Sequence, residues 1–344
     1  MTQSFAIASG RAGVGVVDIT DDLSCLDSGG EWLIVGLFEG PVLAISFEHW
    51  MDARNFVAPK SGWWSGASNW QSHTSQTAYE NAVEVTRQRI ARGDVYQANI
   101  CRLLSAPLPD SHDIFAFYQL LQQHNPAPMS SVVNIVDNRL SAWGIESLEI
   151  ASASPETFLI RTGNVIRSSP IKGTAKSVDG FLQKDNSENI MIVDLVRNDL
   201  SRVCDVASIS VPHLLQPQQH PGLVHLVSTV EGRLEDAATW TEIFDATFPP
   251  GSVSGAPKSS ALTLIAELEQ PRGIYCGTIG VVNGDTKTAN LSVAIRTFWK
   301  ERNRLWFGTG AGITWGSDPT LEWQETELKA ANLMKVAAME WRSE

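Results

Sequence analysis

The sequence predicts an α+β fold, and two observations support this prediction. Short apolar runs of strand composition recur along the chain and are joined mostly by short turns, which favours antiparallel sheet because parallel strands need long crossovers. Longer segments carry apolar residues at helical spacing. No fixed short repeat is present, which argues against solenoids and propellers. Strands are expected at 15–19, 32–38, 42–47, 131–136, 158–161, 208–212, 223–231, 274–282, 290–298 and 305–313, and helices at 78–92, 185–200, 258–269 and 320–340.

The helix over 78–92 illustrates how the elements are assigned. Its apolar positions recur at helical spacing, and Gly93 follows as a stop signal. The preceding stretch, 61–77, is polar and serine-rich without any period, so we expect a boundary or an exposed loop. Packing of its tryptophans on a neighbouring sheet is favoured over a carbohydrate-binding platform; these residues are Trp63, Trp64 and Trp70.

Composition excludes several classes of protein. The 344 residues contain 26 Lys+Arg and 38 Asp+Glu, a formal charge of −12, which argues against nucleic acid and anionic membranes as partners. The four cysteines form no Cys-x-x-Cys pair, so reduced thiols are expected. Neither a signal peptide nor an apolar run of about 18 residues is present, which predicts a soluble cytoplasmic protein. An anionic small substrate would need positive charge supplied locally.

Two expected helices present carboxylates at helical spacing. Asp185 and Glu188 lie three residues apart on one helix, whereas Glu322, Glu325 and Lys329 share a face of another. Together these carboxylates could hold Mg²⁺, which binds few protein carboxylates and keeps water and substrate oxygens. For either helix taken alone, a solvated acidic surface is the favoured interpretation.

Glycine-rich segments and one lysine are further candidates. The segment 308–316 lacks dinucleotide-binding spacing, although its bare amides could donate to a carboxylate. The segment 248–258 leads into a helix whose N-terminus could favour anions, but a plain loop-to-helix turn is preferred. Lys172 lies on a predicted turn and could act as a nucleophile if burial lowers its pKa. Glu156 enters an apolar run and could serve as a general acid.

Read together, these motifs resemble the chorismate-utilising enzyme family, and within it the branch that aminates chorismate. The resemblance covers roughly residues 78–335 and occurs in the family's order. The blocks that carry it are Gly93–Asn99, Ser152–Glu156, Pro170–Thr174, Glu188–Asp199, His225–Val230, Gly251–Lys258, Arg272–Gly277, Val293–Thr297, Gly310–Gly312 and Glu322–Lys329.

The resemblance implies the family fold, in which two large, mainly antiparallel sheets pack together with helices on the outer faces. It also implies that Glu188 and Glu325 ligate Mg²⁺, which bridges to one carboxylate of chorismate. Tyr275 and Arg296 match positions that bind the other carboxylate, and Asp185 stands where other branches carry glutamate. The full set of matching substrate-binding positions is Gly173, Thr174, Asp185, His225, Ser252, Tyr275, Arg296, Gly310, Gly312 and Lys329.

Two positions distinguish the reactions of the family. Branches that add water at C2 carry a lysine base where this chain has Gln97, which cannot take a proton from water. Anthranilate synthases usually carry alanine where this chain has Lys172. In the aminodeoxychorismate branch this lysine attacks C2, Glu156 protonates the leaving C4 hydroxyl, and ammonia then attacks C4 and expels the lysine. The resemblance therefore implies an aminodeoxychorismate synthase: Mg²⁺-dependent amination of chorismate to 4-amino-4-deoxychorismate, on the route to para-aminobenzoate and folate, through a covalent Lys172 intermediate.

The resemblance also bears on domains and partners. Residues 1–77 are expected to form a shortened N-terminal part that contributes strands, and residues 78–344 the chorismate-binding catalytic domain. No amidotransferase Cys-His-Glu set or tryptophan-binding Leu-Leu-Glu-Ser block is recognised, so nitrogen should come from ammonia or a separate glutamine amidotransferase subunit. Two alternatives stay open. One is anthranilate synthase component I or another chorismate-aminating enzyme of secondary metabolism, and the other is a non-catalytic binding module that uses the tryptophan-rich loop.

Overall fold

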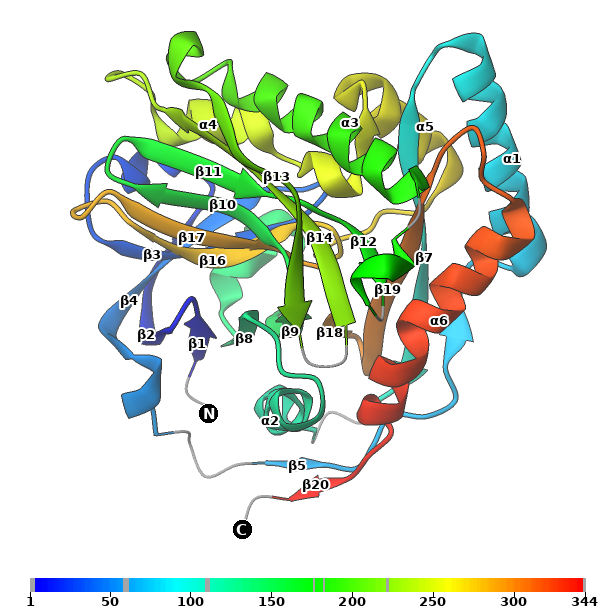
Figure 1. The fold of residues 1–344 in the computed structure, drawn as a ribbon. Helices are drawn as coiled ribbons and strands as arrows, with labels where there is room; N and C mark the ends of the chain where they lie inside the picture. The colour runs from blue at the N-terminus through cyan, green and yellow to red at the C-terminus, as the bar shows by residue number, and fades with distance from the viewer. Residues whose placement is uncertain are drawn as a thin grey trace.

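The structure is a computed structural model that describes residues 4–57, 62–108, 112–175, 177–181, 183–220 and 223–342. Figure 1 shows helices outside a large curved arrangement of strands. The strands are Phe5–Ala8 (β1), Arg11–Thr20 (β2), Glu31–Gly36 (β3), Val42–Asp52 (β4), Trp63–Trp64 (β5), Gln71–Ser72 (β6), Gln97–Pro107 (β7), Met129–Ile135 (β8), Leu148–Ser154 (β9), Thr157–Thr162 (β10), Val165–Ser169 (β11), Ile171–Ala175 (β12), Ser210–His220 (β13), Leu223–Arg233 (β14), Gly255–Ala256 (β15), Thr278–Asn283 (β16), Thr288–Val293 (β17), Thr297–Glu301 (β18), Arg304–Ile313 (β19) and Trp341–Arg342 (β20). The helices are Gln76–Arg92 (α1), Ile114–His124 (α2), Gln183–Leu200 (α3), Trp240–Thr247 (α4), Lys258–Leu268 (α5) and Pro319–Ala337 (α6).

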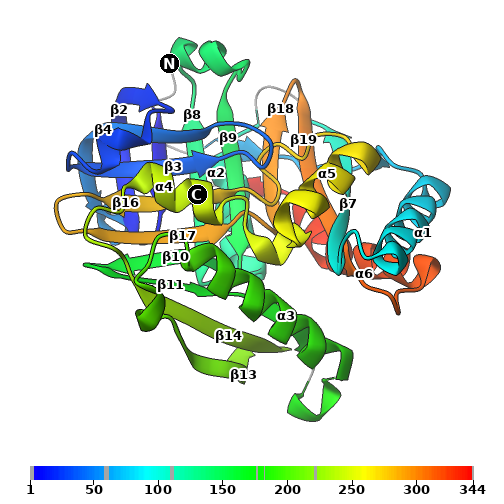
Figure 2. The same cartoon turned by 90° about the horizontal axis from the view of Figure 1, so that it is seen from above.

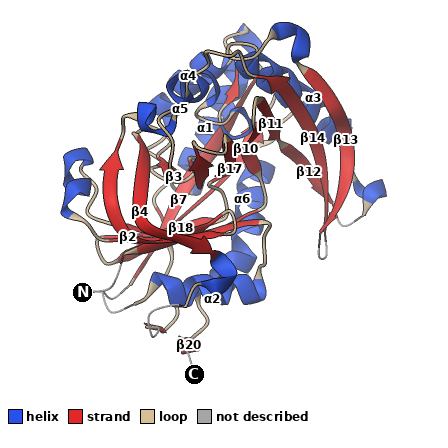
Figure 3. Ribbon diagram, turned by 90° about the vertical axis from the view of Figure 1, so that its left-hand side faces the viewer, coloured by secondary structure: helices blue, strands red, loops and turns tan. Residues whose placement is uncertain are grey.

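Antiparallel pairing connects most of the strands into one continuous sheet, whereas β5 and β20 form a separate two-stranded sheet. The order of the large sheet runs β13–β14–β11–β10–β17–β16–β3–β4–β2–β1–β8–β9–β18–β19–β7, and β12 also pairs with β14. The α+β prediction with mainly antiparallel strands is confirmed, and the two expected layers are parts of one hydrogen-bonded sheet. Seen from the side, this sheet curves, with helices on its outside (Figure 3). Figure 2 shows α3 beside β14.

Local chemistry explains where the predicted helices begin and end. At the start of α1 the Ser75 hydroxyl accepts from the Ala78 N–H, and Gly93 ends the helix at φ +82°, as its sequence position predicts. The carboxylate of Asp318 accepts from two backbone N–H groups at the start of α6, where Pro319 occupies the first turn. All four expected helices are present, with ends that differ by a few residues.

The structure corrects two of the expected strands and adds two helices. The run 274–282 begins with a turn in which Cys276 has φ +67°, and only Thr278–Asn283 is strand. The run 290–298 is interrupted before Arg296, whose φ is +50°, so that it forms parts of β17 and β18. Sequence patterns missed α2 because its apolar residues are consecutive and buried on more than one face, which obscures helical spacing. The short α4 was also missed.

The tryptophan-rich segment packs against the rest of the fold. Trp64 is fully buried, stacks on Phe117 of α2 at 4.4 Å between ring centroids, and donates from Nε1 to the Ala337 carbonyl at 3.0 Å. The Trp70 ring contacts Phe298 edge-on. The expectation that these tryptophans pack on a neighbouring sheet is therefore confirmed for Trp70, whose partner Phe298 lies on β18, whereas Trp64 packs on the helix α2 instead. The segment also contains the two short strands β5 and β6.

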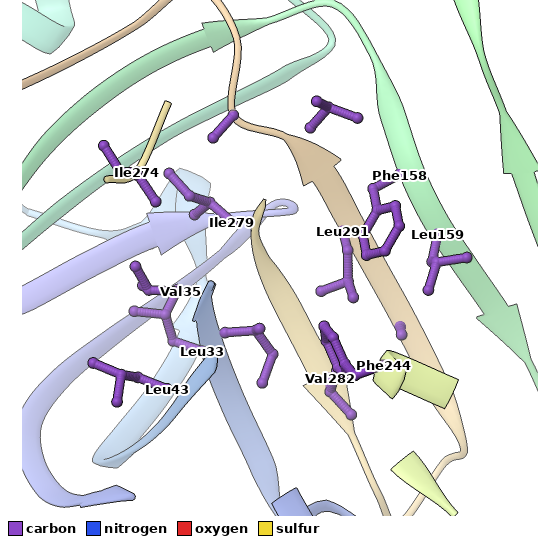
Figure 4. Packing of buried hydrophobic residues seen from close by; sticks show 14 of the residues in the cluster. Leu33, Val35, Leu43, Phe158, Leu159, Phe244, Ile274, Ile279, Val282 and Leu291 are labelled. Carbon is purple, nitrogen blue, oxygen red and sulfur yellow. The ribbon is translucent and has the colours of Figure 1, made fainter. Parts of the chain in front are cut away.

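The main hydrophobic core lies between sheet strands and α4 (Figure 4). Leu33 of β3 and Leu291 of β17 contribute to it and are fully buried. Phe244 of α4 lies on the helix side of the same cluster. Burying this apolar surface contributes about 25 cal/mol per Å² relative to water, which favours compact packing of the layers. Among the residues that the structure describes, no helix has the length and apolar character needed to cross a membrane.

A buried ion pair connects β7, the 251–253 turn and the segment that follows α5. The Arg272 side chain is 1% exposed and pairs with Glu269, with 2.8 Å between Nε and Oε2. Its other nitrogens donate to the Val253 carbonyl at 2.9 Å and the Asn99 carbonyl at 2.8 Å. Glu269 in turn accepts from the Cys101 backbone N–H at 2.8 Å. The pair thus fixes the start of β7 to the 251–253 turn and to the segment after α5.

Replacing Arg272 by methionine is expected to destabilise the protein by about 3–5 kcal/mol, because the Glu269 carboxylate would stay buried without its cation. Chemical denaturation monitored by tryptophan fluorescence measures this loss. The matched control is Arg197→Met, because Arg197 belongs to a solvent-exposed i,i+3 pair with Asp194. That pair should contribute less than about 0.5 kcal/mol. Equal losses in the two variants would contradict the structural role given to Arg272.

Candidate active site

Lys172 lies on a bulged strand, which corrects the prediction that it occupies a turn. It belongs to β12, and the register of β12 against β14 shifts between Ile171 and Thr174. Gly173 has φ +85°, a conformation that glycine adopts without a Cβ penalty. A bulge re-aims a side chain relative to a regular strand. Gly173 therefore permits the bulge, and the bulge turns the Lys172 side chain out of the regular in-and-out alternation of strand side chains.

The Lys172 amine lies among amide groups from the far end of the sheet. A Cβ added to Gly312 of β19 would lie 3.5 Å from Lys172 Nζ, 3.0 Å from Gln97 Nε2 and 3.0 Å from Asn99 Oδ1. Gln97 is fully buried, and its amide atoms have no hydrogen-bond partner within the described part of the chain. The sheet curves so that β12 and β7, which are far apart in strand order, meet here.

Burial lowers the pKa of Lys172 from its usual value, and this is the largest influence on the amine. The nearby carboxylates of Glu188, Glu156 and Glu325 oppose this effect, whereas the positive charge of Lys329 adds to it. A lowered pKa increases the fraction of neutral amine, which is the nucleophilic form. These interactions indicate that the four charged side chains lie near the Lys172 amine.

Glu156 is positioned between β9 and β10 and is 4% exposed. Its backbone N–H donates to the Ser154 hydroxyl at 3.2 Å, and its carbonyl accepts from the Val293 N–H at 3.0 Å. Burial raises the pKa of its carboxyl group, although the Ser252 hydroxyl and the charge of Lys172 act in the opposite direction. A carboxyl group that keeps its proton beside an amine is suited to general acid catalysis.

Glu188 and Glu325 approach the site from two helices. Glu188 lies on α3, and Glu325 lies on α6, where its Oε1 is 2.6 Å from Lys329 Nζ. The Lys329 amine also donates to the Gly310 carbonyl at 3.0 Å. No cluster of three or more His, Cys, Asp or Glu side chains suited to a metal is found among the described residues. Mg²⁺ nevertheless binds few protein carboxylates, so the chemistry of this donor pair is compatible with it.

Glycines of β19 let other groups approach this strand closely. A Cβ on Gly308 would lie 2.1 Å from Tyr275 Cγ, and one on Gly310 would lie 2.5 Å from Cys101 Sγ. Real Cβ atoms do not approach so closely, so larger residues would displace the Tyr275 ring or β7. Burial lowers the pKa of Arg296, which lies just after β17, although the negative charge of the nearby Glu156 opposes this effect.

The remaining predicted positions lie around the β12 bulge. His225 of β14 is 3% exposed and is the register partner of Thr174. Ser252 is 6% exposed in the 251–253 turn. The backbone of Asp185 lies in the first turn of α3, but the side chains of Asp185 and Thr174 are outside the described part.

Sequence reasoning missed the contribution of Asn99. Its Nδ2 donates to the Ser252 carbonyl at 2.7 Å, which directs its Oδ1 toward the space above Gly312. Asn99 lies two residues after Gln97, so strand alternation places both side chains on one face of β7. That spacing was the available signal. The site as a whole combines an amine, a buried acid and acidic groups from two helices, which suits nucleophilic attack with acid-assisted departure of a leaving group.

Comparison with known proteins places this site in context. Residues 57–335 match the family described as chorismate binding enzyme. The chain is 32% identical over 322 residues to aminodeoxychorismate synthase component 1 of Salmonella typhimurium, covering 88% of this chain and 68% of that protein. It is 34% identical over 280 residues to anthranilate synthase component 1 1 of Haloarcula marismortui, covering 78% of this chain and 55% of that protein. The chain thus spans between about half and two thirds of the length of these relatives.

Solved structures share the fold at lower identity. Anthranilate synthase component I from Streptococcus pneumoniae superposes with a TM-score of 0.76 at 24% identity, covering 96% of this chain and 90% of that chain. The menaquinone-specific isochorismate synthase MenF from Escherichia coli gives a TM-score of 0.77 at 16% identity, covering 98% and 89%. The family match over most of the chain, together with these relatives, identifies the protein as a member of the chorismate-binding enzyme family.

Proposed function

We propose that the protein aminates chorismate at C4 and yields 4-amino-4-deoxychorismate, with Lys172 as a covalent nucleophile. One observation carries this proposal: the Lys172 amine has a lowered pKa and shares its site with the buried Glu156 carboxyl group. Gln97 supports it, because a neutral amide beside the lysine cannot act as the base that water addition needs.

The proposed reaction proceeds through two displacements. The neutral Lys172 amine forms a bond to C2, the ring double bonds shift, and the C4–O bond breaks while Glu156 protonates the departing hydroxyl to water. Ammonia then forms a bond to C4, the double bonds shift back, and the C2–N bond to Lys172 breaks. The protons released by the attacking nitrogens return to the Glu156 carboxylate and to Lys172. The balance is chorismate plus ammonia giving aminodeoxychorismate plus water.

Mg²⁺ fits the proposed site. Glu188 of α3 and Glu325 of α6 would hold it, since an ion that binds two protein carboxylates keeps positions for water and for a substrate carboxylate. Bound there, the ion would neutralise and orient one carboxylate of the substrate. The other carboxylate would bind near Arg296 and Tyr275. These contacts would hold the ring in reach of Lys172, which lowers the entropic barrier to attack.

The nitrogen would be supplied as ammonia, either free or from a separate glutamine amidotransferase subunit. The relatives are named component 1, which supports a partner subunit. A second candidate function is amination at C2 to give anthranilate. It is favoured by relatives named anthranilate synthase component 1, which are as similar to this chain as those named aminodeoxychorismate synthase. Release of pyruvate from chorismate distinguishes this candidate, since 4-amino-4-deoxychorismate retains its pyruvyl ether.

The covalent intermediate should be visible by mass spectrometry. Wild-type protein mixed with chorismate and Mg²⁺ in the absence of ammonia, then quenched in acid, should gain the mass of chorismate less one water. Lys172→Ala should gain no mass because the nucleophile is absent. Lys335→Ala, at an exposed position in the last turn of α6, should form the adduct normally. An adduct that persists in Lys172→Ala would contradict the assignment of the nucleophile.

The raised pKa of Glu156 predicts how activity depends on pH. Burial lets the carboxyl group keep its proton to higher pH than an exposed glutamate. As the pH rises through this raised pKa, the acid loses its proton and kcat should fall. Glu156→Gln should reduce kcat by about 10²- to 10⁴-fold and abolish this alkaline decline. Measurements of kcat across pH test this, with the exposed Glu301→Gln as control. An unchanged alkaline decline in Glu156→Gln would argue against Glu156 as the acid.

Metal binding can be tested separately from catalysis. In isothermal titration calorimetry with chorismate present, Glu188→Gln and Glu325→Gln should each weaken Mg²⁺ binding by more than about tenfold, since even groups behind metal ligands contribute that much. Glu327→Gln, also on α6, should bind Mg²⁺ like wild type because Glu327 pairs with Arg102 instead. Equal affinity in all three variants would refute the predicted ligands.

A further inference from the structure

A second buried ion pair, between Asp199 and Lys258, connects the helices α3, α4 and α5. Asp199 Oδ2 of α3 lies 2.7 Å from Lys258 Nζ of α5, and their side chains are only 9% and 15% exposed. Lys258 Nζ also donates to the Thr247 carbonyl at the end of α4, at 2.8 Å. Both residues belong to sequence motifs that the proposed reaction does not use.

This pair borders the turn that carries Ser252. A Cβ on Gly251 would lie 2.7 Å from Leu195 Cδ2 and 3.8 Å from Asp199 Oδ2, so the turn packs directly on α3 beside the carboxylate. On its other side the turn is held by the hydrogen bond from Asn99 Nδ2 to the Ser252 carbonyl, at 2.7 Å. The Ser252 hydroxyl contacts the carboxyl group of Glu156.

Part of the turn borders a cavity and is not closely packed there. A cavity of about 20 Å³ adjoins it and is lined by Asp199, Ser252, Gly251, Thr247 and Ser168 among others. That volume could hold about one water molecule. Asp199 and Thr247, the two residues that the Lys258 amine binds, thus border the same cavity as the turn.

We infer that Asp199 and Lys258 form a positioning pair that holds the 251–253 turn so that the Ser252 hydroxyl stays in hydrogen-bonding contact with Glu156. The inference rests on the proposed function, in which Glu156 is the general acid. Neither Asp199 nor Lys258 touches the reacting atoms. They act through Ser252, and loss of the pair should impair acid catalysis more than substrate binding.

The pair is sensitive to pH. Burial raises the pKa of Asp199 to about 6, although the charges of Lys258 and of Arg202, two residues after the end of α3, favour its ionised form. The carboxylate is therefore ionised and paired above about pH 6, and it takes up a proton as the pH falls through that value. The pair weakens in the same range, so part of the acidic decline in kcat should belong to Asp199.

Neutralising both partners tests this role without leaving a single buried charge. The double variant Asp199→Asn/Lys258→Met should lower kcat for chorismate consumption by about tenfold, a fraction of what a positioned acid contributes, with KM for chorismate changed less than about twofold. It should also lose the decline in kcat near pH 6. The single variant Lys258→Arg keeps the cation beside Asp199 and should therefore retain most of the wild-type activity. The matched control is the double variant Glu149→Gln/Lys300→Met, because these residues form a similarly buried pair at 3.2 Å between β9 and β18.

An infrared measurement tests the same inference without turnover. The difference spectrum between wild type and Glu156→Gln isolates the carboxyl band of Glu156, which reports its hydrogen bond from Ser252. This band should shift with a midpoint near pH 6 in wild type and should be constant in the double variant. A band that does not change across this range, or a double variant with the wild-type pH profile, would overturn the inference. A wild-type protein that does not consume chorismate would refute the proposed function, whereas the infrared result would still decide the positioning role.

Discussion

The buried pair of Arg272 and Glu269 is the interaction on which the rest of the site depends. Its hydrogen bonds reach β7 at Asn99 and Cys101 and the 251–253 turn at Val253. These segments carry groups that line the space around Lys172. Burying two charges is costly, so the pair is favourable only because hydrogen bonds satisfy its donors and acceptors. With the backbone fixed in this way, Asn99 can bind the Ser252 carbonyl, and the two ends of the curved sheet can meet at Gly312.

The local balance of charge explains how an acidic chain can suit an anionic substrate. The chain carries a formal charge of −12, yet Lys172, Arg296 and Lys329 all approach the site. Burial favours the neutral forms of Glu156 and Lys172. In the proposed function, Arg296 and Lys329 supply the local positive side chains, and Glu188 and Glu325 are the acids that bind the metal. At short range in a partly desolvated site, these few charges outweigh the distant surface charge, because solvent and salt screen the latter.

The sequence alone predicted those helix ends that are set by residues only a few positions away. The glycine after α1 and the aspartate before α6 predicted the end of one helix and the start of another, because capping involves residues only a few positions apart. The bulge at Lys172 was not predictable in this way, since it depends on how β12 pairs with β14. Likewise, motif resemblance indicated Glu156 and Lys172, but the meeting of Gln97, Asn99 and Lys172 at Gly312 depends on a register between distant strands that spacing does not reveal. The Arg272–Glu269 and Asp199–Lys258 pairs, with their hydrogen bonds, connect three or more segments and were missed for the same reason.

The central claim is that nitrogen is placed at C4 of chorismate while its pyruvyl ether stays intact. The most direct test incubates the protein with chorismate, Mg²⁺ and an ammonium salt at alkaline pH and identifies the products by mass spectrometry, with and without an added lyase that cleaves aminodeoxychorismate. The account predicts that 4-amino-4-deoxychorismate accumulates, that no pyruvate is released before the lyase is added, and that para-aminobenzoate forms afterwards. Anthranilate together with pyruvate in the absence of the lyase would contradict it.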